Sequence, residues 1–146
     1  MKNAEVQILL IEDNMNDAEL TVRALQKHKI ANNIIHLKDG ADAIDYLFGK
    51  GSYEKRDINN QPNVILLDLK MPKVDGLEVL RIIKTNEFTK KIPVVMLTSS
   101  KENPDIQRAY ALGANSYIVK PVGFEGFTKA IMELGFYWML LNQSPE

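Results

Sequence analysis

The sequence predicts an α/β domain in which helices cover both faces of a five-stranded parallel sheet. Five short, mostly aliphatic runs alternate with longer segments whose apolar residues recur at helical spacing. The first run is almost wholly apolar and precedes acidic residues, which is typical of a strand buried on both faces of a parallel sheet. Strands that alternate with helices in this way favour a doubly wound architecture with right-handed connections.

The first half of the chain contains two strands and two helices, followed by an irregular segment. Residues 6–11 are the first strand, and residues 16–29 carry apolar side chains at helical spacing. Residues 34–37 are the second strand, and a short helix follows near residues 43–48. Residues 49–62 contain glycine, asparagine, proline and a mixed-charge stretch, so we expect an insertion that forms a surface loop or an exposed helix extension.

The third and fourth strands enclose one helix. Residues 64–67 are the third strand, and the helix that follows begins near Asp75, which has the spacing of a capping box with Glu78. The fourth strand, residues 92–97, has Pro93 near its start, where a missing N–H donor is tolerated.

The last third of the chain supplies two helices and the fifth strand. Asn103 and Pro104 suit the cap and the first position of a helix, and Gly113 is the expected end of that helix. Residues 116–119 are the fifth strand. The last helix is expected over about residues 124–142, an extended C-terminal element.

Length and composition restrict the class of protein. The 146 residues are 45% hydrophobic and 25% charged, which predicts one domain over residues 1–146 that needs no metal or disulfide to fold. A net charge of −1 argues against nucleic acid as the main partner, and the absence of cysteine excludes disulfides and thiol chemistry. The polar start does not resemble a signal peptide, and no apolar run approaches the ~18 residues of a membrane span. We therefore expect a cytoplasmic protein without membrane contact.

Polar residues that can support chemistry follow four of the five strands. Glu12 and Asp13 follow the first strand, Asp68 the third, Thr98 the fourth and Lys120 the fifth. In open parallel sheets, sites form where the carboxyl ends of the strands meet. Each residue alone is more often a cap or a turn, but their joint occurrence at the strand ends predicts a site.

Three converging carboxylates predict a divalent cation. Two unit charges ~4 Å apart repel by about 4 kcal/mol at an effective dielectric constant of ~20. Mg²⁺ removes that cost and takes carboxylate and phosphate oxygens as ligands. A carboxylate beside Mg²⁺ can act as the nucleophile toward a phosphoryl group, and Lys120 and Thr98 can then stabilise the phosphoryl oxygens.

These residues resemble those of response-regulator receiver domains over nearly the whole chain. The motifs that carry the resemblance are Leu9–Asn14, Leu66–Pro72, Asp75-Gly76, Met96–Ser99, Gly113-Ala114 and Tyr117–Pro121. The resemblance implies a flavodoxin-like fold with strand order 2-1-3-4-5. It also implies two-component signalling, in which a sensor histidine kinase donates the phosphoryl group of its phosphohistidine.

The resemblance assigns a role to each site residue. Asp68 would be the phosphoacceptor. Mg²⁺ would be bound directly by Asp13 and Asp68, mainly through water by Glu12, and by the backbone carbonyl of Lys70. No other cofactor is implied.

The remaining roles concern the response to phosphorylation. Lys120 would pair with the phosphoryl oxygens, Thr98 would swing in to bond them, and Tyr117 would turn inward. The bond before Pro121 would be cis. Such a protein is a phosphoacceptor rather than a turnover enzyme, and its output is a change of protein–protein contacts.

The insertion and the apolar C-terminal segment are similar to those of single-domain regulators paired with phytochromes. Phe124, Phe127, Ile131, Leu134 and Trp138 are expected to form one core-facing stripe. Phe136, Tyr137 and residues 139–141 add apolar surface on other faces, which either packs within the molecule or forms a contact with a kinase or a second copy. The resemblance implies a homodimer through the last helix and strand, with a phytochrome-type kinase as partner.

Three alternatives compete with this interpretation. A Mg²⁺-dependent phosphohydrolase with Asp68 as nucleophile would need a second aspartate where Lys70 stands. A nucleotide or flavin site would need a glycine-rich loop where Glu12 and Asp13 stand. A receiver that signals without phosphate would not need the complete residue set. His28 and His36 are interpreted as surface or strand residues far from the site.

Overall fold

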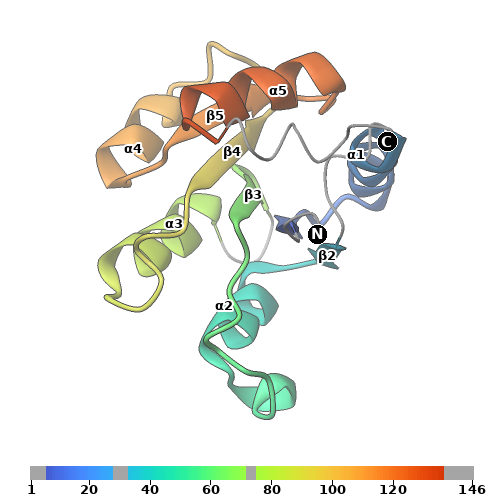
Figure 1. Ribbon diagram of the computed structural model, residues 1–146. Coiled ribbons are helices and arrows are strands. Elements are labelled where there is room, and N and C mark those ends of the chain that lie inside the picture. The colour runs from blue at the N-terminus through green and yellow to red at the C-terminus, as the bar shows by residue number, and fades with distance from the viewer. Residues whose placement is uncertain (1–5, 28–32, 72–74, 137–146) are drawn as a thin grey trace.

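The computed structural model describes residues 6–27, 33–71 and 75–136, and it confirms the doubly wound parallel sheet (Figure 1). The strands run in the order β2-β1-β3-β4-β5, and every neighbouring pair is parallel. Leu9 at the centre of β1 aligns with Ile35 on one side and Ile65 on the other. The strands are β1 (Gln7–Ile11), β2 (Asn33–Leu37), β3 (Val64–Asp68), β4 (Val94–Thr98) and β5 (Ser116–Val119).

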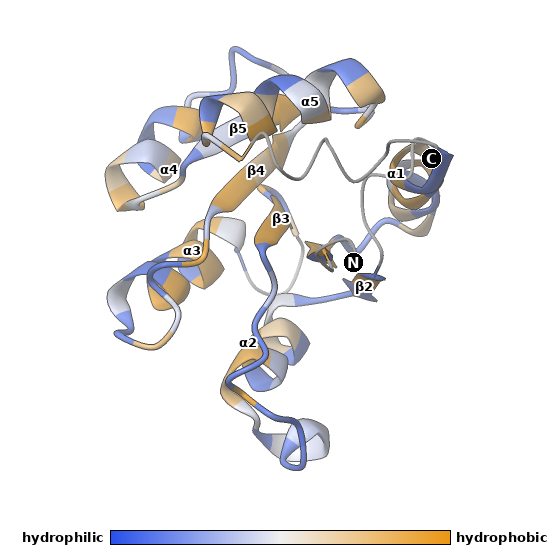
Figure 2. Ribbon diagram, viewed as in Figure 1, coloured by the Kyte–Doolittle hydropathy of each residue, from blue (hydrophilic) through white to orange (hydrophobic). Residues whose placement is uncertain are grey.

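Alternate residues of the strands enter two separate cores. Leu9 and Ile11 face α2, α3 and α4, whereas Ile8 and Leu10 face α1 and α5. All residues of β1, β3 and β4 are buried, and these strands are the hydrophobic centre of the molecule (Figure 2). The helices are α1 (Met15–Lys27), α2 (Gly40–Phe48), α3 (Gly76–Thr85), α4 (Asp105–Leu112) and α5 (Phe124–Glu133).

The expected end of α4 is confirmed, and the helix begins one residue later than expected, at Asp105 after Pro104. The Asn103 side chain accepts from the Asp105 N–H at 2.9 Å, and Gly113 ends α4 with a φ of 111°. A simple side-chain cap stands in place of the expected capping box. The Asp75 carboxylate accepts from the Leu77 N–H at 3.1 Å, but Glu78 pairs with Arg81 one turn further along the helix. Arg81 competes for the Glu78 carboxylate because it lies three residues away on the same helix face.

The segment 49–62 is held in place by Arg56. It begins with a short 3₁₀ helix, Gly51–Tyr53, and extends away from the sheet beyond α2 (Figure 1). The Arg56 guanidinium lies 3.8 Å from the centre of the Tyr46 ring and donates to the carbonyls of Tyr46 at 2.8 Å and Asn60 at 2.6 Å. The Gln61 side chain also donates to the Leu47 carbonyl at 2.9 Å. The segment is therefore an irregular loop anchored to α2, not an extension of the helix.

The prediction of a last helix that reaches residue 142 is wrong. The helix α5 ends at Glu133, and Gly135 adopts a left-handed conformation with a φ of 81°. The Phe136 N–H then donates to the Ile131 carbonyl at 3.1 Å, and the Gly135 N–H to the Met132 carbonyl at 3.0 Å. This pair of bonds is the Schellman motif that ends helices at glycine.

The expected core-facing stripe of this helix is confirmed within the described residues. Phe127 and Ile131 are fully buried, and Phe124, Leu134 and Phe136 pack against the same core. Trp138, Tyr137 and residues 139–141 lie outside the described residues. Among the helices that the structure describes, none is long and apolar enough to cross a membrane.

Candidate functional site

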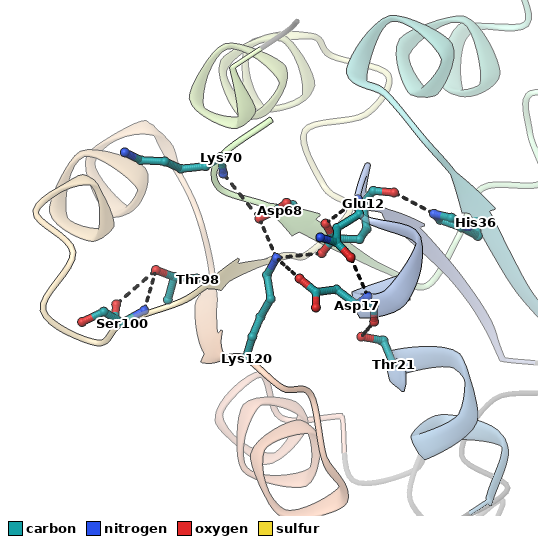
Figure 3. Close-up of polar contacts among 10 residues, drawn as sticks. Glu12, Asp17, Thr21, His36, Asp68, Lys70, Thr98, Ser100 and Lys120 are labelled. Atoms are coloured by element: carbon teal, nitrogen blue, oxygen red, sulfur yellow. Dashed lines mark hydrogen bonds and ion pairs between the residues drawn. The ribbon is translucent and has the colours of Figure 1, made fainter. Parts of the chain in front are cut away.

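The predicted site residues converge at the carboxyl edge of the sheet (Figure 3). Glu12 follows β1, Asp68 ends β3, Thr98 ends β4 and Lys120 follows β5. Glu12, Asp13 and Asp68 each offer a carboxylate oxygen within 4.8 Å of the others. The parallel topology brings them together because every strand ends at the same edge.

Glu12 is fully buried and fixed from several directions. Its N–H donates to the Leu37 carbonyl at 3.1 Å, and its own carbonyl lies 2.7 Å from Nε2 of His36. Its Oε2 accepts from the Asn14 N–H at 3.1 Å. The expectation that His36 lies far from the site is therefore wrong, because β2 is the neighbour of β1 and ends beside it.

Lys120 is surrounded by three carboxylates. Its Nζ lies 2.9 Å from Oε1 of Glu12, 3.1 Å from Oδ2 of Asp17 and 3.2 Å from Oδ1 of Asp68. Burial lowers the pKa of Lys120, but these carboxylates outweigh burial and leave its pKa above the ordinary value. The ammonium therefore stays charged. The Lys120–Pro121 peptide bond is cis, the form that the resemblance implied.

Asp68 lies in a crowded negative environment. Burial, followed by the neighbouring Glu12, raises the pKa of Asp68 to about 7, against the opposing effect of Lys120. A single ammonium does not neutralise Glu12, Asp13, Asp17 and Asp68 together. The donor set is entirely carboxylate oxygen, which fits a hard divalent cation such as Mg²⁺, Mn²⁺ or Ca²⁺.

A small cavity of about 110 Å³ opens beside Asp68. Thr98, Asn103 and Lys120 are among its lining residues. The Thr98 hydroxyl donates to the Ser100 carbonyl at 3.1 Å and so is turned toward the β4–α4 loop (Figure 3). The cavity gives a group bound to Asp68 access to a lysine and a threonine.

The structure places Lys70 and Tyr117 at the margin of this arrangement. The Lys70 N–H donates to Oδ1 of Asp68 at 3.4 Å, while its side chain points away from the carboxylates (Figure 3). Tyr117 lies half-buried on β5 with its ring edge-on to that of Tyr110, 6.4 Å between centroids, and is not among the residues that line the cavity.

Sequence reasoning missed three residues at the site. They are Asn14, Asp17 and His36. Asp17 lies in the first turn of α1, whereas Asp13 precedes that helix, so no helical spacing related the two in the sequence. The His36 residue type carried no signal by itself. The strand order implied by the resemblance, which places β2 beside β1, was the one clue to its position.

The fold and the site define a receiver-type signalling domain, with an acidic cluster and a lysine at the carboxyl edge of a flavodoxin-like sheet. The sequence model of the response regulator receiver domain matches residues 8–132. The chain belongs to this family and is a response regulator of two-component signalling.

Curated relatives support the same assignment over nearly their whole length. The chain is 42% identical to the "Probable methanogenesis regulatory protein FilR2" of Methanothrix harundinacea, covering 94% of this chain and 86% of the relative. It is 39% identical to "Response regulator Rcp1" of Synechocystis, covering 90% of this chain and 88% of the relative.

Solved structures show that the similarity extends to phytochrome-associated regulators. The bacteriophytochrome response regulator AtBRR superposes with a TM-score of 0.84 and 52% identity, covering 92% of this chain and 96% of that one. Mn²⁺-bound Rcp1 superposes with a TM-score of 0.73 and 38% identity, covering 92% of this chain and 94% of that one. The phosphorylated cyanobacterial phytochrome response regulator RcpA superposes with a TM-score of 0.74 and 34% identity, covering 98% of this chain and 100% of that one.

Proposed function

We propose that Asp68 accepts a phosphoryl group from the phosphohistidine of a sensor kinase and that this modification switches protein–protein contacts. The observation that carries the proposal is the position of the Asp68 carboxylate. It lies beside an open cavity, within 4.8 Å of the other acidic ligand atoms and 3.2 Å from the Lys120 ammonium. The phosphorylated state of the similar regulator RcpA supports it.

Mg²⁺ is the proposed cofactor. Asp13 and Asp68 would bind it directly, Glu12 mainly through water, and the Lys70 carbonyl would be the remaining protein ligand. The bound ion supplies positive charge between the carboxylates and the phosphoryl oxygens. The convergence of three carboxylates and the Mn²⁺-bound state of Rcp1 support a divalent site.

The transfer itself is an in-line displacement. A carboxylate oxygen of Asp68 attacks the phosphorus, a P–O bond forms, the P–N bond to the imidazole breaks, and that nitrogen keeps the electron pair. Lys120 donates to a phosphoryl oxygen. Thr98 leaves the Ser100 carbonyl to donate to another phosphoryl oxygen, and Tyr117 turns inward after it.

The proposed partners follow from the phytochrome-associated relatives. A histidine kinase, of phytochrome type, would present its phosphohistidine in the cytoplasm. A second copy of the chain would contact α5 and β5, where Met132 and Val119 are exposed.

We also propose that residues 1–146 act as one receiver unit in which residues 49–62 are an insertion. In this role the chain is a phosphoacceptor and not a turnover enzyme.

Intact mass spectrometry tests the proposal directly. The wild type, Asp68→Asn and Asp57→Asn are incubated with Mg²⁺ and acetyl phosphate. Asp57 is a matched control, because it is an exposed aspartate in the insertion. We expect one phosphoryl adduct on the wild type and the control and none on Asp68→Asn. An adduct that persists in Asp68→Asn would exclude Asp68 as the acceptor, and sustained turnover of phosphate esters would favour the phosphohydrolase.

A further inference from the structure

We propose that Asp17 is a positioning residue that restrains the Lys120 ammonium and thereby weakens the hold of Lys120 on a phosphoryl group at Asp68. The inference rests on the proposed function, because it concerns the same phosphorylated aspartate. It adds a fourth carboxylate, from α1, to the three that approach one another at the strand ends.

Three carboxylates surround the Lys120 ammonium. Its contact with Asp17 has hydrogen-bond geometry, whereas those with Glu12 and Asp68 are ion pairs. An ammonium group has three N–H donors. Its three neighbours here are carboxylate oxygens of Glu12, Asp17 and Asp68, at 2.9 to 3.2 Å. Movement of the ammonium toward a phosphoryl oxygen in the cavity therefore has to lengthen or break the hydrogen bond to Asp17.

Asp17 is the partner outside the buried cluster. Glu12 and Asp68 have side chains that are 0% and 6% exposed, whereas the Asp17 side chain is 38% exposed. Figure 3 shows Asp17 approaching Lys120 from α1, away from the strand ends. A phosphoryl group on Asp68 draws the ammonium toward the cavity, and the Asp17 contact opposes that movement.

The backbone of Asp17 is fixed, so its carboxylate is a tether and not a free surface group. Its N–H donates to the Asn14 side chain at 2.9 Å, and its carbonyl accepts from the Thr21 hydroxyl at 2.9 Å. The Asn14 N–H in turn donates to Oε2 of Glu12. The first turn of α1 therefore connects Asp17 to the same acidic residue that holds Lys120 from the other side.

The expected size of the effect is modest. An ion pair of this partial exposure changes an equilibrium by about two- to fivefold. Asp17→Asn keeps the shape of the side chain and removes the charge that attracts Lys120. We therefore expect tighter binding of a phosphoryl analogue and faster phosphorylation by a small donor.

The test measures the affinity for beryllofluoride, an acyl-phosphate mimic, by calorimetry with saturating Mg²⁺. We expect Asp17→Asn to bind about two- to fivefold more tightly than the wild type. Asp17→Glu keeps the charge and is expected to restore the wild-type affinity. Glu19→Gln removes one charge from an exposed position of the same helix and is expected to change nothing. Circular dichroism verifies that each variant is folded.

A second measurement separates an action through Lys120 from a direct effect on the anion. The rate of phosphorylation by acetyl phosphate is compared for Asp17→Asn in the wild type and in Lys120→Ala. The gain must disappear in Lys120→Ala. A gain that persists there, an equal gain in Glu19→Gln, or unchanged or weaker binding in Asp17→Asn would overturn the inference. A wild type that binds no beryllofluoride and takes up no phosphoryl group would overturn the proposed function, and this inference with it.

Discussion

The buried carboxylate of Asp68 destabilises the folded chain when no cation neutralises it. Its pKa rises from an ordinary value of 3.8 to about 7, so the folded state keeps a proton that the unfolded chain loses between these values. Stability contributed by this group is present below about pH 4 and is lost as the pH rises through about 7.

Asp68→Asn should therefore stabilise the metal-free protein above neutral pH. We expect the free energy of unfolding to rise by about 1–3 kcal/mol at pH 8 and by much less at pH 4, since each pKa unit corresponds to about 1.4 kcal/mol. Urea unfolding with a chelator measures this, with Asp57→Asn as the control. Added Mg²⁺ should shrink the difference. A variant that is no more stable than the wild type at pH 8 would disprove the crowding of charge at Asp68.

The contact between His36 and the Glu12 carbonyl makes a second prediction at the level of single residues. His36→Phe keeps the ring but leaves a main-chain acceptor at the site without its side-chain partner. The loss of such a hydrogen bond costs about 1–2 kcal/mol. Chemical denaturation should detect it, and Ile35→Leu on the same strand is a control that keeps all hydrogen bonds. Equal stabilities of His36→Phe and the wild type would show that this bond is not needed to hold Glu12.

Within single elements, Arg56 makes several of the contacts that anchor the insertion. Arg56→Ala removes two hydrogen bonds to carbonyls and the contact with the Tyr46 ring. We expect a loss of about 1–3 kcal/mol and faster hydrogen exchange over residues 49–62. The neighbouring Lys55→Ala, at an exposed position, should have little effect. Unchanged exchange in Arg56→Ala would contradict the anchoring role.

The end of α5 depends on the conformation of Gly135. Gly135→Ala places a Cβ on a residue with a φ of 81°, and we expect a loss of about 1 kcal/mol from strain alone, because no atom lies within 4 Å of that Cβ. Gly123→Ala is the matched control, since it is equally open but extended, with a φ of −119°. Thermal unfolding compares the two, and a Gly135→Ala variant as stable as Gly123→Ala would contradict the left-handed helix end.

The same helix shows that the apolar pattern of the sequence was insufficient to predict where α5 ends. The apolar spacing from Phe124 to Trp138 fits one continuous helix, and this periodicity concealed the stop at Gly135. Glycine at the end of a helix was used correctly for Gly113. The difference is that Phe136, which follows Gly135, packs against the same core as the helix, so the apolar pattern extends past Glu133, where the helix ends.

At the scale of the whole molecule, the alternation of strands and helices was enough to predict the doubly wound parallel sheet. The order of strands came from the resemblance. The site residues that end strands were predictable, because parallel topology alone brings Asp68 and Lys120 to one edge. Asp17 and His36 were not predicted as site residues, because neither ends a strand that points at the site. Asp17 reaches the site from a helix and His36 from an edge strand, and their contacts depend on the packing of those elements.

The proposed dimer makes a prediction for the assembled molecule. Sedimentation should show a larger species that increases when beryllofluoride is added with Mg²⁺. Met132→Asp places a charge on the exposed face of α5 and should weaken association about tenfold or more, whereas Leu20→Asp on α1 should not. A monomer in every condition would exclude the dimer.

The anchored insertion also offers a place to attach a reporter. Ser52 is exposed in its 3₁₀ helix, which lies at the opposite end of the molecule from α4 and α5 (Figure 1). The chain contains no cysteine, so Ser52→Cys would create a single thiol. A fluorophore coupled there would report the tumbling of the protein in solution while leaving the acidic pocket and the face formed by α5 and β5 untouched.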